Sequence, residues 1–166
     1  MTTASSRTQV RYAVGDWIAT AGITNLNQVF ASHPKRINFE QNAPVGSACR
    51  VAGVVFIVRE TEDRIAVGGA YDGWKRVDFD VQFQLFAHCM HNYSQDAMDD
   101  FDVVVDAVKA RLRSGGHRLG MESGDVIWQA AEPDITSEFG EPLTNDGGAT
   151  EIWATLNFTV TQMIRS

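Results

Sequence analysis

Residues 74–89 read WKRVDFDVQFQLFAHC, and from Val77 onward apolar and polar side chains alternate almost without a break. Successive side chains of a β-strand point to opposite faces of its sheet. One face would then carry Val77, Phe79, Val81, Phe83, Leu85 and Ala87. The other would carry Asp78, Asp80, Gln82, Gln84, Phe86 and His88. This pattern predicts a long strand with one buried face and one solvated face.

A second stretch of the same kind runs from Glu151 to Ile164. One of its faces would be apolar, with Ile152, Ala154, Leu156, Phe158 and Val160. The opposite face would carry Trp153, Thr155, Asn157, Thr159 and Thr161. Two strands of matching length and pattern are expected to pair antiparallel in one sheet.

Two amphipathic segments are predicted to be helices that cover the apolar face of this sheet. The first has apolar residues three and four apart and stops at Gly22: Val10, Val14, Trp17, Ile18 and Ala21. The second has Ser94 as N-cap and the apolar stripe Met98, Phe101, Val104, Val105, Val108 and Leu112. We therefore predict an α+β fold, a two-layer sandwich of a mostly antiparallel β-sheet packed by about two α-helices, in a single domain over residues 1–166.

The other segments are assigned from local composition. Further strands are expected at Val51–Arg59, Arg64–Val67 and Asp125–Ala131, with a turn at Glu60–Asp63 between the first two. Two long polar segments are expected to be mostly irregular: Ile23–Ala48, with a short extended piece at Arg36–Glu40, and Pro133–Thr150, which ends in a turn-forming Asn-Asp-Gly-Gly.

Charge and composition exclude several classes of function. The formal net charge is −7, which disfavours general nucleic-acid binding and docking on an anionic membrane. The first ten residues, MTTASSRTQV, hold no apolar segment, and no apolar run approaches the roughly 18 residues that cross a bilayer. Cys49 and Cys89 form no CxxC pair, so we expect two thiols in a reducing compartment.

No cluster of residues predicts a catalytic, cofactor or metal site. His88, Cys89 and His91 are close in sequence, but neighbouring residues of a strand point to opposite faces and a structural zinc site needs four ligands. Three acids on one helix face, Asp99, Asp102 and Asp106, are interpreted as a solvated surface, with Asp106 paired to Lys109. Asp78 and Asp80 are interpreted as solubilising charges on the outer strand face. We therefore expect no enzyme activity.

The order of elements resembles the tail terminator proteins (minor tail or tail-completion proteins) of long-tailed bacteriophages. Four parts of the chain carry the resemblance: Leu26–Phe30 leading to Pro34-Lys35, the strand Val77–Ala87, the helix Phe101–Arg113 and the terminal strand Ile152–Ile164. It covers nearly the whole chain, but it is an order of elements and includes no catalytic motif.

The resemblance implies a structural virion protein of the tail, assembled in the host cytoplasm. Its subunits would form a homo-oligomeric ring, usually a hexamer, that ends polymerisation of the tail-tube protein and offers a surface to the head connector or stopper protein. Genome DNA would pass through the lumen without sequence-specific binding. We expect the contacts with neighbouring subunits or the tail tube to involve Phe30, His33, Pro34, Arg36, Phe86 and Trp153.

Two alternatives remain open. The first is another head–tail connector or minor tail protein, since related two-layer domains are expected along a phage tail. The second belongs to another class, a small-ligand-binding α+β protein or an enzyme with a site on the curved sheet. A pocket with converging polar groups would favour this second alternative. The exposed Trp153 on an otherwise polar strand face favours a protein contact instead.

Overall fold

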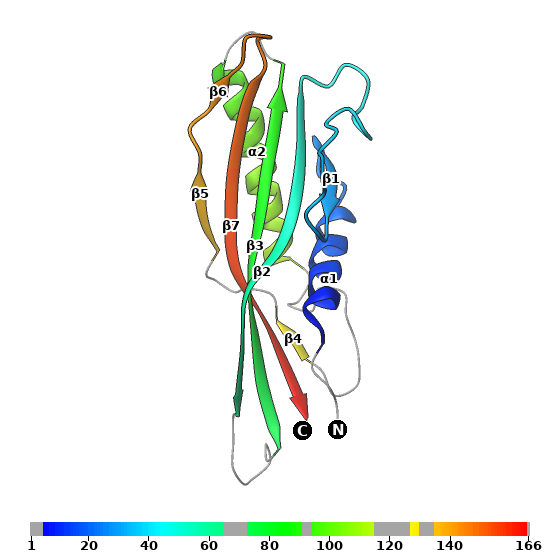
Figure 1. The fold of residues 1–166 in the computed structure, drawn as a ribbon, viewed down its shortest axis with the longest axis vertical. Helices are drawn as coiled ribbons and strands as arrows, with labels where there is room; N and C mark the ends of the chain where they lie inside the picture. The colour runs from blue at the N-terminus through cyan, green and yellow to red at the C-terminus, as the bar shows by residue number, and fades with distance from the viewer. Residues whose placement is uncertain (1–4, 65–72, 91–93, 115–126, 130–134, 166) are drawn as a thin grey trace.

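The computed structural model describes residues 5–64, 73–90, 94–114, 127–129 and 135–165. In chain order its elements are α1 (Arg7–Ala19), β1 (Leu26–Phe30), β2 (Cys49–Arg64), β3 (Trp74–Cys89), α2 (Ser94–Arg113), β4 (Ile127–Gln129), β5 (Thr136–Phe139), β6 (Leu143–Thr144) and β7 (Thr150–Arg165). The strands form one sheet with the order β1-β2-β3-β7-β4, and β5 and β6 also pair with β7. Both helices lie on the same side of this sheet (Figure 1).

Strands β3 and β7 form the centre of the sheet and confirm the predicted antiparallel pair. Their register is unbroken from Trp74 opposite Arg165 to Cys89 opposite Thr150. The six apolar residues predicted on the inner face of β3 are all at most 2% exposed. The predicted two-layer α+β sandwich is therefore correct, with a sheet that is antiparallel except for the parallel pair β1–β2.

Helix α1 begins in a capping box. The Ser6 hydroxyl accepts a hydrogen bond from the Gln9 backbone N–H, and the Gln9 side chain accepts one from the Ser6 N–H. Val10, Val14 and Ile18 recur every fourth residue and are completely buried against the sheet. The helix ends earlier than the apolar spacing predicts, since Ala21 lies beyond it and is exposed. Gly22 then adopts the left-handed conformation with φ +61°.

Helix α2 covers β2, β3 and β7 with the predicted stripe, apart from one residue. Met98 is 42% exposed, and Ala97 is the buried residue of that turn. The ends of the two helices are joined by a reciprocal contact. Arg111 Nε donates to the Trp17 carbonyl at 2.8 Å, the Trp17 indole donates to the Arg111 carbonyl at 3.1 Å, and the guanidinium lies 3.6 Å from the Trp17 ring centroid.

Replacing Arg111 by Lys should lower the free energy of unfolding by about 1–2 kcal/mol, because an ammonium lacks the planar fork that both stacks and donates. Chemical denaturation monitored by circular dichroism measures this change. Arg113→Lys is the matched control, since Arg113 is on the same helix and exposed. An equal, small loss in both variants would contradict a specific role for Arg111.

Several segments predicted from composition differ in the structure. The turn expected at Glu60–Asp63 is absent, because β2 continues through it and pairs with β3 as far as Arg64. The extended piece in the first polar segment is Leu26–Phe30, not Arg36–Glu40. The second polar segment contains β5 and β6, both paired with β7. In these places hydrogen bonding to a neighbouring strand outweighs a polar composition.

The strand expected at Asp125–Ala131 is β4 over its middle residues, and its two ends lie outside the described residues, as do 65–67 of the strand expected at Arg64–Val67. The cysteines also differ from the prediction of two thiols. They occupy opposite positions of β2 and β3 and form a disulfide, with both side chains buried.

Candidate interaction surface

The outer face of the sheet, opposite the helices, carries the side chains from which a binding site could be built. In its middle, the polar residues of β3 and β7 bond to one another. Gln82 Nε2 donates to Asn157 Oδ1 at 3.2 Å, and Gln84 Nε2 donates to Gln82 Oε1 at 2.9 Å. These amides occupy directly opposed or alternate positions, where side chains of a sheet meet. These two bonds use part of the hydrogen-bonding capacity of the three amides within the sheet itself.

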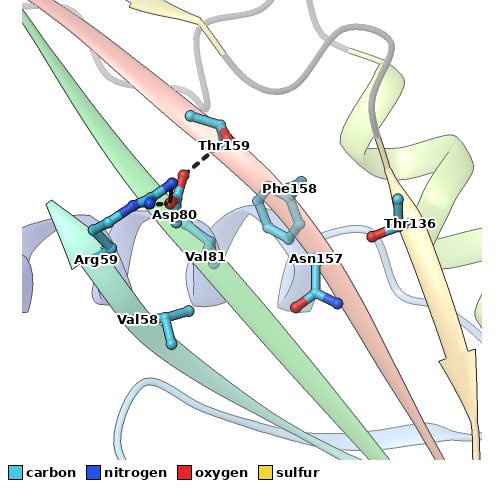
Figure 2. Close-up of a pocket in the computed structure, with 8 residues that line it drawn as sticks. All are labelled: Val58, Arg59, Asp80, Val81, Thr136, Asn157, Phe158 and Thr159. Carbon is cyan, nitrogen blue, oxygen red and sulfur yellow. Dashed lines mark hydrogen bonds and ion pairs between the residues drawn. The ribbon is translucent and has the colours of Figure 1, made fainter. Parts of the chain in front are cut away.

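The two strand carboxylates lie further along this face and are neutralised within the chain. Arg59 Nε lies 2.7 Å and its Nη2 2.6 Å from Asp80 Oδ2, while Thr159 donates to Asp80 Oδ1 at 3.2 Å. These residues are drawn in Figure 2. They line part of an open hollow of about 490 Å³. Asp78 has similar partners. Arg76 Nε lies 2.9 Å from Asp78 Oδ2, and the Thr161 hydroxyl donates to Asp78 Oδ1 at 2.6 Å. The interpretation as solvated charges is therefore wrong: both are partly buried ion-pair partners.

An apolar groove lies at the other end of the outer face. Phe86 and Trp153 are directly opposite each other in the β3–β7 register and form its floor. Ile37 and Phe39 line one wall, and Leu143 of β6 lines the other, around a volume of about 270 Å³. Trp153 is 45% exposed and Leu143 65% exposed. Exposed aromatic and aliphatic side chains gathered in one hollow are typical of a protein contact.

The segment between β1 and β2 folds back over the outer face and builds one wall of this groove. Gln28 is only 8% exposed, and its Nε2 donates to the carbonyl of Asn38 and, at 2.9 Å, to that of Gln41. The Phe39 ring stacks on His88 with centroids 5.6 Å apart. Part of the loop expected to reach a partner is therefore held by its own sheet.

The six residues predicted to make contacts fall into two groups. Phe30 ends β1, and the next residues lie over β2, with the His33 ring 5.8 Å from that of Phe56. Pro34 is half-buried and Arg36 is exposed. Phe86 and Trp153 form the separate groove. Sequence reasoning missed Ile37, Phe39 and Leu143, which come from segments with no strong pattern.

Among the residues that the structure describes, no three His, Cys, Asp or Glu side chains converge as they would around a metal ion. His88 and Cys89 point to opposite faces of β3, as strand geometry predicts, and His91 lies outside the described residues. The predicted pair of Asp106 and Lys109 is present at 3.6 Å. Within the described ranges, no helix is long and apolar enough to cross a membrane.

Trp153 keeps its position because Gly140 leaves room for the indole. A Cβ added at Gly140 would lie 2.0 Å from both Cε2 and Nε1 of Trp153. Gly140→Ala should therefore displace the indole and lower the free energy of unfolding by about 1–2 kcal/mol. The measurement is denaturation of Gly140→Ala with and without Trp153→Ala. The loss should disappear when the indole is absent, and an equal loss in both backgrounds would contradict this contact.

Comparison with known proteins does not assign the chain to a family. No protein-family model matches the sequence, and no curated protein matches it significantly.

Proposed function

We propose that this chain is a structural subunit of a phage tail, a tail terminator that forms a ring, ends growth of the tail tube and offers the surface to which the head connector or stopper protein binds. The fold supports the proposal, since β3, α2 and β7 occupy the segments of the chain that carry the resemblance. The exposed aromatic groove supports a role in protein contacts. Other head–tail connector and minor tail proteins remain the nearest alternative.

One observation carries this proposal: the sheet continues beyond its helical layer. The ends of β2, β3 and β7 extend together below both helices in Figure 1. We call residues 58–64 and 74–76 the arm. All seven residues from Val58 to Arg64 are exposed, including Val58 at 65%. Among the described residues β2 has no strand partner on its outer edge beyond Val54, so the arm presents an unpaired strand edge that another protein can cover. A long arm is therefore best explained by a neighbouring protein against which it lies.

The charged residues of the arm disfavour unspecific pairing of the β2 edge with a strand of another chain and favour a specific contact. A bulge between Ile57 and Arg59 and the charged run Arg59-Glu60-Thr61-Glu62-Asp63-Arg64 both protect the edge of β2. Lys75 Nζ lies 2.6 Å from Glu62 Oε1 and links the two strands of the arm. The arm is thus a specified element of the fold, suited to contact the tail tube or an adjacent subunit.

The net charge of −7 also fits passage of DNA through a ring, because an acidic lumen would repel the genome and would not retain it. The ligand-binding alternative has less support. The hollow in Figure 2 presents Asp80 already bonded to Arg59 and Thr159, so these polar groups do not converge on an empty position. The groove presents mainly apolar walls.

The experiment is deletion of the coding gene from the phage that carries it, with electron microscopy of the particles. The expected result is tails longer than normal with no heads attached. Complementation should succeed with the natural chain and fail with a short-arm variant, in which residues 63–76 are removed and Glu62 joins Val77 through Asn-Gly. These two residues are directly opposite in the sheet, so a two-residue turn can connect them.

The short-arm variant must first be shown to fold, by a circular dichroism spectrum and a cooperative unfolding transition like those of the natural chain. Particles with normal tails and attached heads in the deletion strain would overturn the proposal. Full complementation by the folded short-arm variant would show that the arm is not needed for this function.

A further inference from the structure

The apolar groove on the outer face contains a carboxylate. Among the described residues that line it, Glu151 is charged and the others are apolar. Glu151 and Trp153 are alternate residues of β7, so both side chains lie on the outer face. The Glu151 side chain is 58% exposed, and its one ion-pair contact within the described ranges is His88, with Nδ1 3.9 Å from Oε1. This separation is longer than a hydrogen bond, so the carboxylate can accept hydrogen bonds from a ligand.

The indole of Trp153 is held with one ring face against the protein and the other toward the groove. A Cβ added at Gly140 would lie 2.0 Å from Cε2, 2.0 Å from Nε1 and 2.5 Å from Cδ2. These three distances place the point above the ring plane, so one face of the indole rests on Gly140. Trp153 is 45% exposed and lines the groove, so the opposite face is the open one. Of the aromatic rings, tryptophan binds a cation over its face most strongly.

Negative charge flanks this ring along the outer face. Glu151 is two residues before Trp153, and Glu138 of β5 is directly opposite Thr155, two residues after it. Glu138 is exposed and has no ion-pair partner in the part of the chain that the structure describes. The described residues that line the groove include no cation of this chain. The groove is therefore an aromatic hollow whose unpaired charge is negative.

A nearby cation of the chain is already neutralised. Arg50 of β2 is directly opposite His88 in the β2–β3 register. Its Nη1 lies 3.0 Å from Glu40 Oε1, and its side chain is only 21% exposed. The charge that Glu151 lacks must therefore come from another molecule.

We propose that the groove binds an arginine side chain of another protein, presented by an extended segment with apolar residues on both sides of it. The guanidinium stacks on the open face of Trp153 and donates to the Glu151 carboxylate, while the neighbouring apolar side chains contact Phe39 and Leu143. Arginine fits better than lysine because its planar fork stacks on a ring and bonds a carboxylate at the same time. A volume of about 270 Å³ is small for a site of a free small molecule, which favours a side chain as the occupant.

This inference goes beyond the proposed function, because it gives the chemistry of the partner and not the assembly to which the partner belongs. It does not require a tail protein as the partner. Its test uses the purified chain, whereas the proposed function is tested on particles of a deletion strain. The failure of one therefore leaves the other standing.

The test is calorimetric titration of the full chain with the peptide acetyl-Gly-Leu-Arg-Leu-Gly-amide. Two comparison peptides carry citrulline or lysine in place of the arginine, and citrulline keeps the shape without the charge. The arginine peptide should bind about 10-fold more tightly than the citrulline peptide, because the charged group gains both the carboxylate and the ring face. The lysine peptide should lie between them.

Two variants separate the two parts of the site. Glu151→Gln removes the charge at almost constant size and should reduce the preference for arginine over citrulline to about 3-fold, the share of the ring alone. Trp153→Leu keeps an apolar side chain and should weaken binding of the arginine peptide by about 5-fold, since the stacking face is lost. Glu151 is largely exposed, so its variant folds even if Trp153→Leu does not.

Matched controls make the same changes away from the groove. Glu60→Gln removes an exposed carboxylate of β2, and Tyr12→Leu removes an exposed ring of α1 that is 54% accessible. Both should bind the arginine peptide like the natural chain. An unchanged unfolding transition in each variant shows that a loss of binding is not a loss of fold.

Several results would overturn the inference. Equal binding of the arginine and citrulline peptides would make the groove purely apolar, and equal binding of the arginine and lysine peptides would reject the guanidinium. No binding of the arginine peptide at ~10 mM would reject the site itself. Equal effects of Glu151→Gln and Glu60→Gln would show a general effect of charge. Sedimentation velocity at the same concentrations gives the last of these results: self-association that Trp153→Leu abolishes would make a second copy the occupant.

Discussion

Gly53→Ala is expected to lower the free energy of unfolding by about 3 kcal/mol, the upper part of the range for overpacked cores. Gly53 lies within β2 and directly faces the Phe83 ring of β3. An added Cβ would lie 2.1 Å from Phe83 Cζ and 2.7 Å from Cε2. Phe83 is completely buried, so its ring has no solvent into which it can move. Either β2 must separate from β3, or the ring must leave its favoured rotamer.

Gly15→Ala is the matched control, because Gly15 is also buried but its added Cβ would make only ordinary contacts. The nearest atoms, on Val29, Ala31 and Val55, are 3.7 to 3.8 Å away. Gly15 is inside α1, where alanine is favoured over glycine. This variant should be more stable by about 0.5–1 kcal/mol. Denaturant unfolding measures both variants, and similar changes in the two would contradict the role of Phe83. Phe83→Leu should partly rescue Gly53→Ala.

Phe101→Ala is expected to cost about 3–5 kcal/mol, because a large aromatic side chain leaves a cavity between α2 and the sheet. Phe101 is 1% exposed and belongs to the central cluster of buried residues. Its neighbour Val103 points outward on the same helix and is 67% exposed. Val103→Ala should change stability by no more than about 0.5 kcal/mol. Thermal and denaturant unfolding compare the two, and a small loss for Phe101→Ala would contradict the packing described for α2.

The long elements of the fold were predictable because each repeats its pattern many times. β3 and β7 alternate over a dozen residues, which set both the buried face and the antiparallel pairing. The apolar stripe of α2, at helical spacing, set the buried face of that helix in the same way. A single misplaced residue, such as Met98, does not change the outcome when the rest of the stripe is consistent.

The short elements were not predictable by the same reasoning. β6 has two residues and β5 four, too few for a period to be recognised. β1 pairs parallel with β2, and a parallel pair has no hairpin turn that could be recognised in the sequence. β2 continues through Glu60–Asp63 because β3 supplies hydrogen bonds and the Lys75–Glu62 ion pair to this polar stretch. These assignments depend on neighbours that are distant in sequence.

The groove escaped prediction for a related reason. Trp153 and Phe86 could be placed on one outer face from alternation alone, and the structure puts them in adjacent strands. Its walls come from residues 37–39 and from β6, which are more than a hundred residues apart in the chain. The acidic side chains of the outer face also differ from expectation, since Asp78 and Asp80 form ion pairs with Arg76 and Arg59. Whether a charged side chain is free depends on its ion-pair partner, which is on the same strand for Asp78 and on the neighbouring strand for Asp80.

The position of β7 in the sheet has a consequence for synthesis of the protein. β3, β4, β5 and β6 all hydrogen-bond to β7, although each of them precedes it in the chain. A nascent chain that has emerged as far as Asp146 therefore has β3 with one bare edge and no template for the three short strands. Pairings of such long sequence separation form slowly. The native sheet can close only after translation has passed β7, and until then the bare edge of β3 needs protection, by a chaperone or by the ribosome itself, from joining another chain.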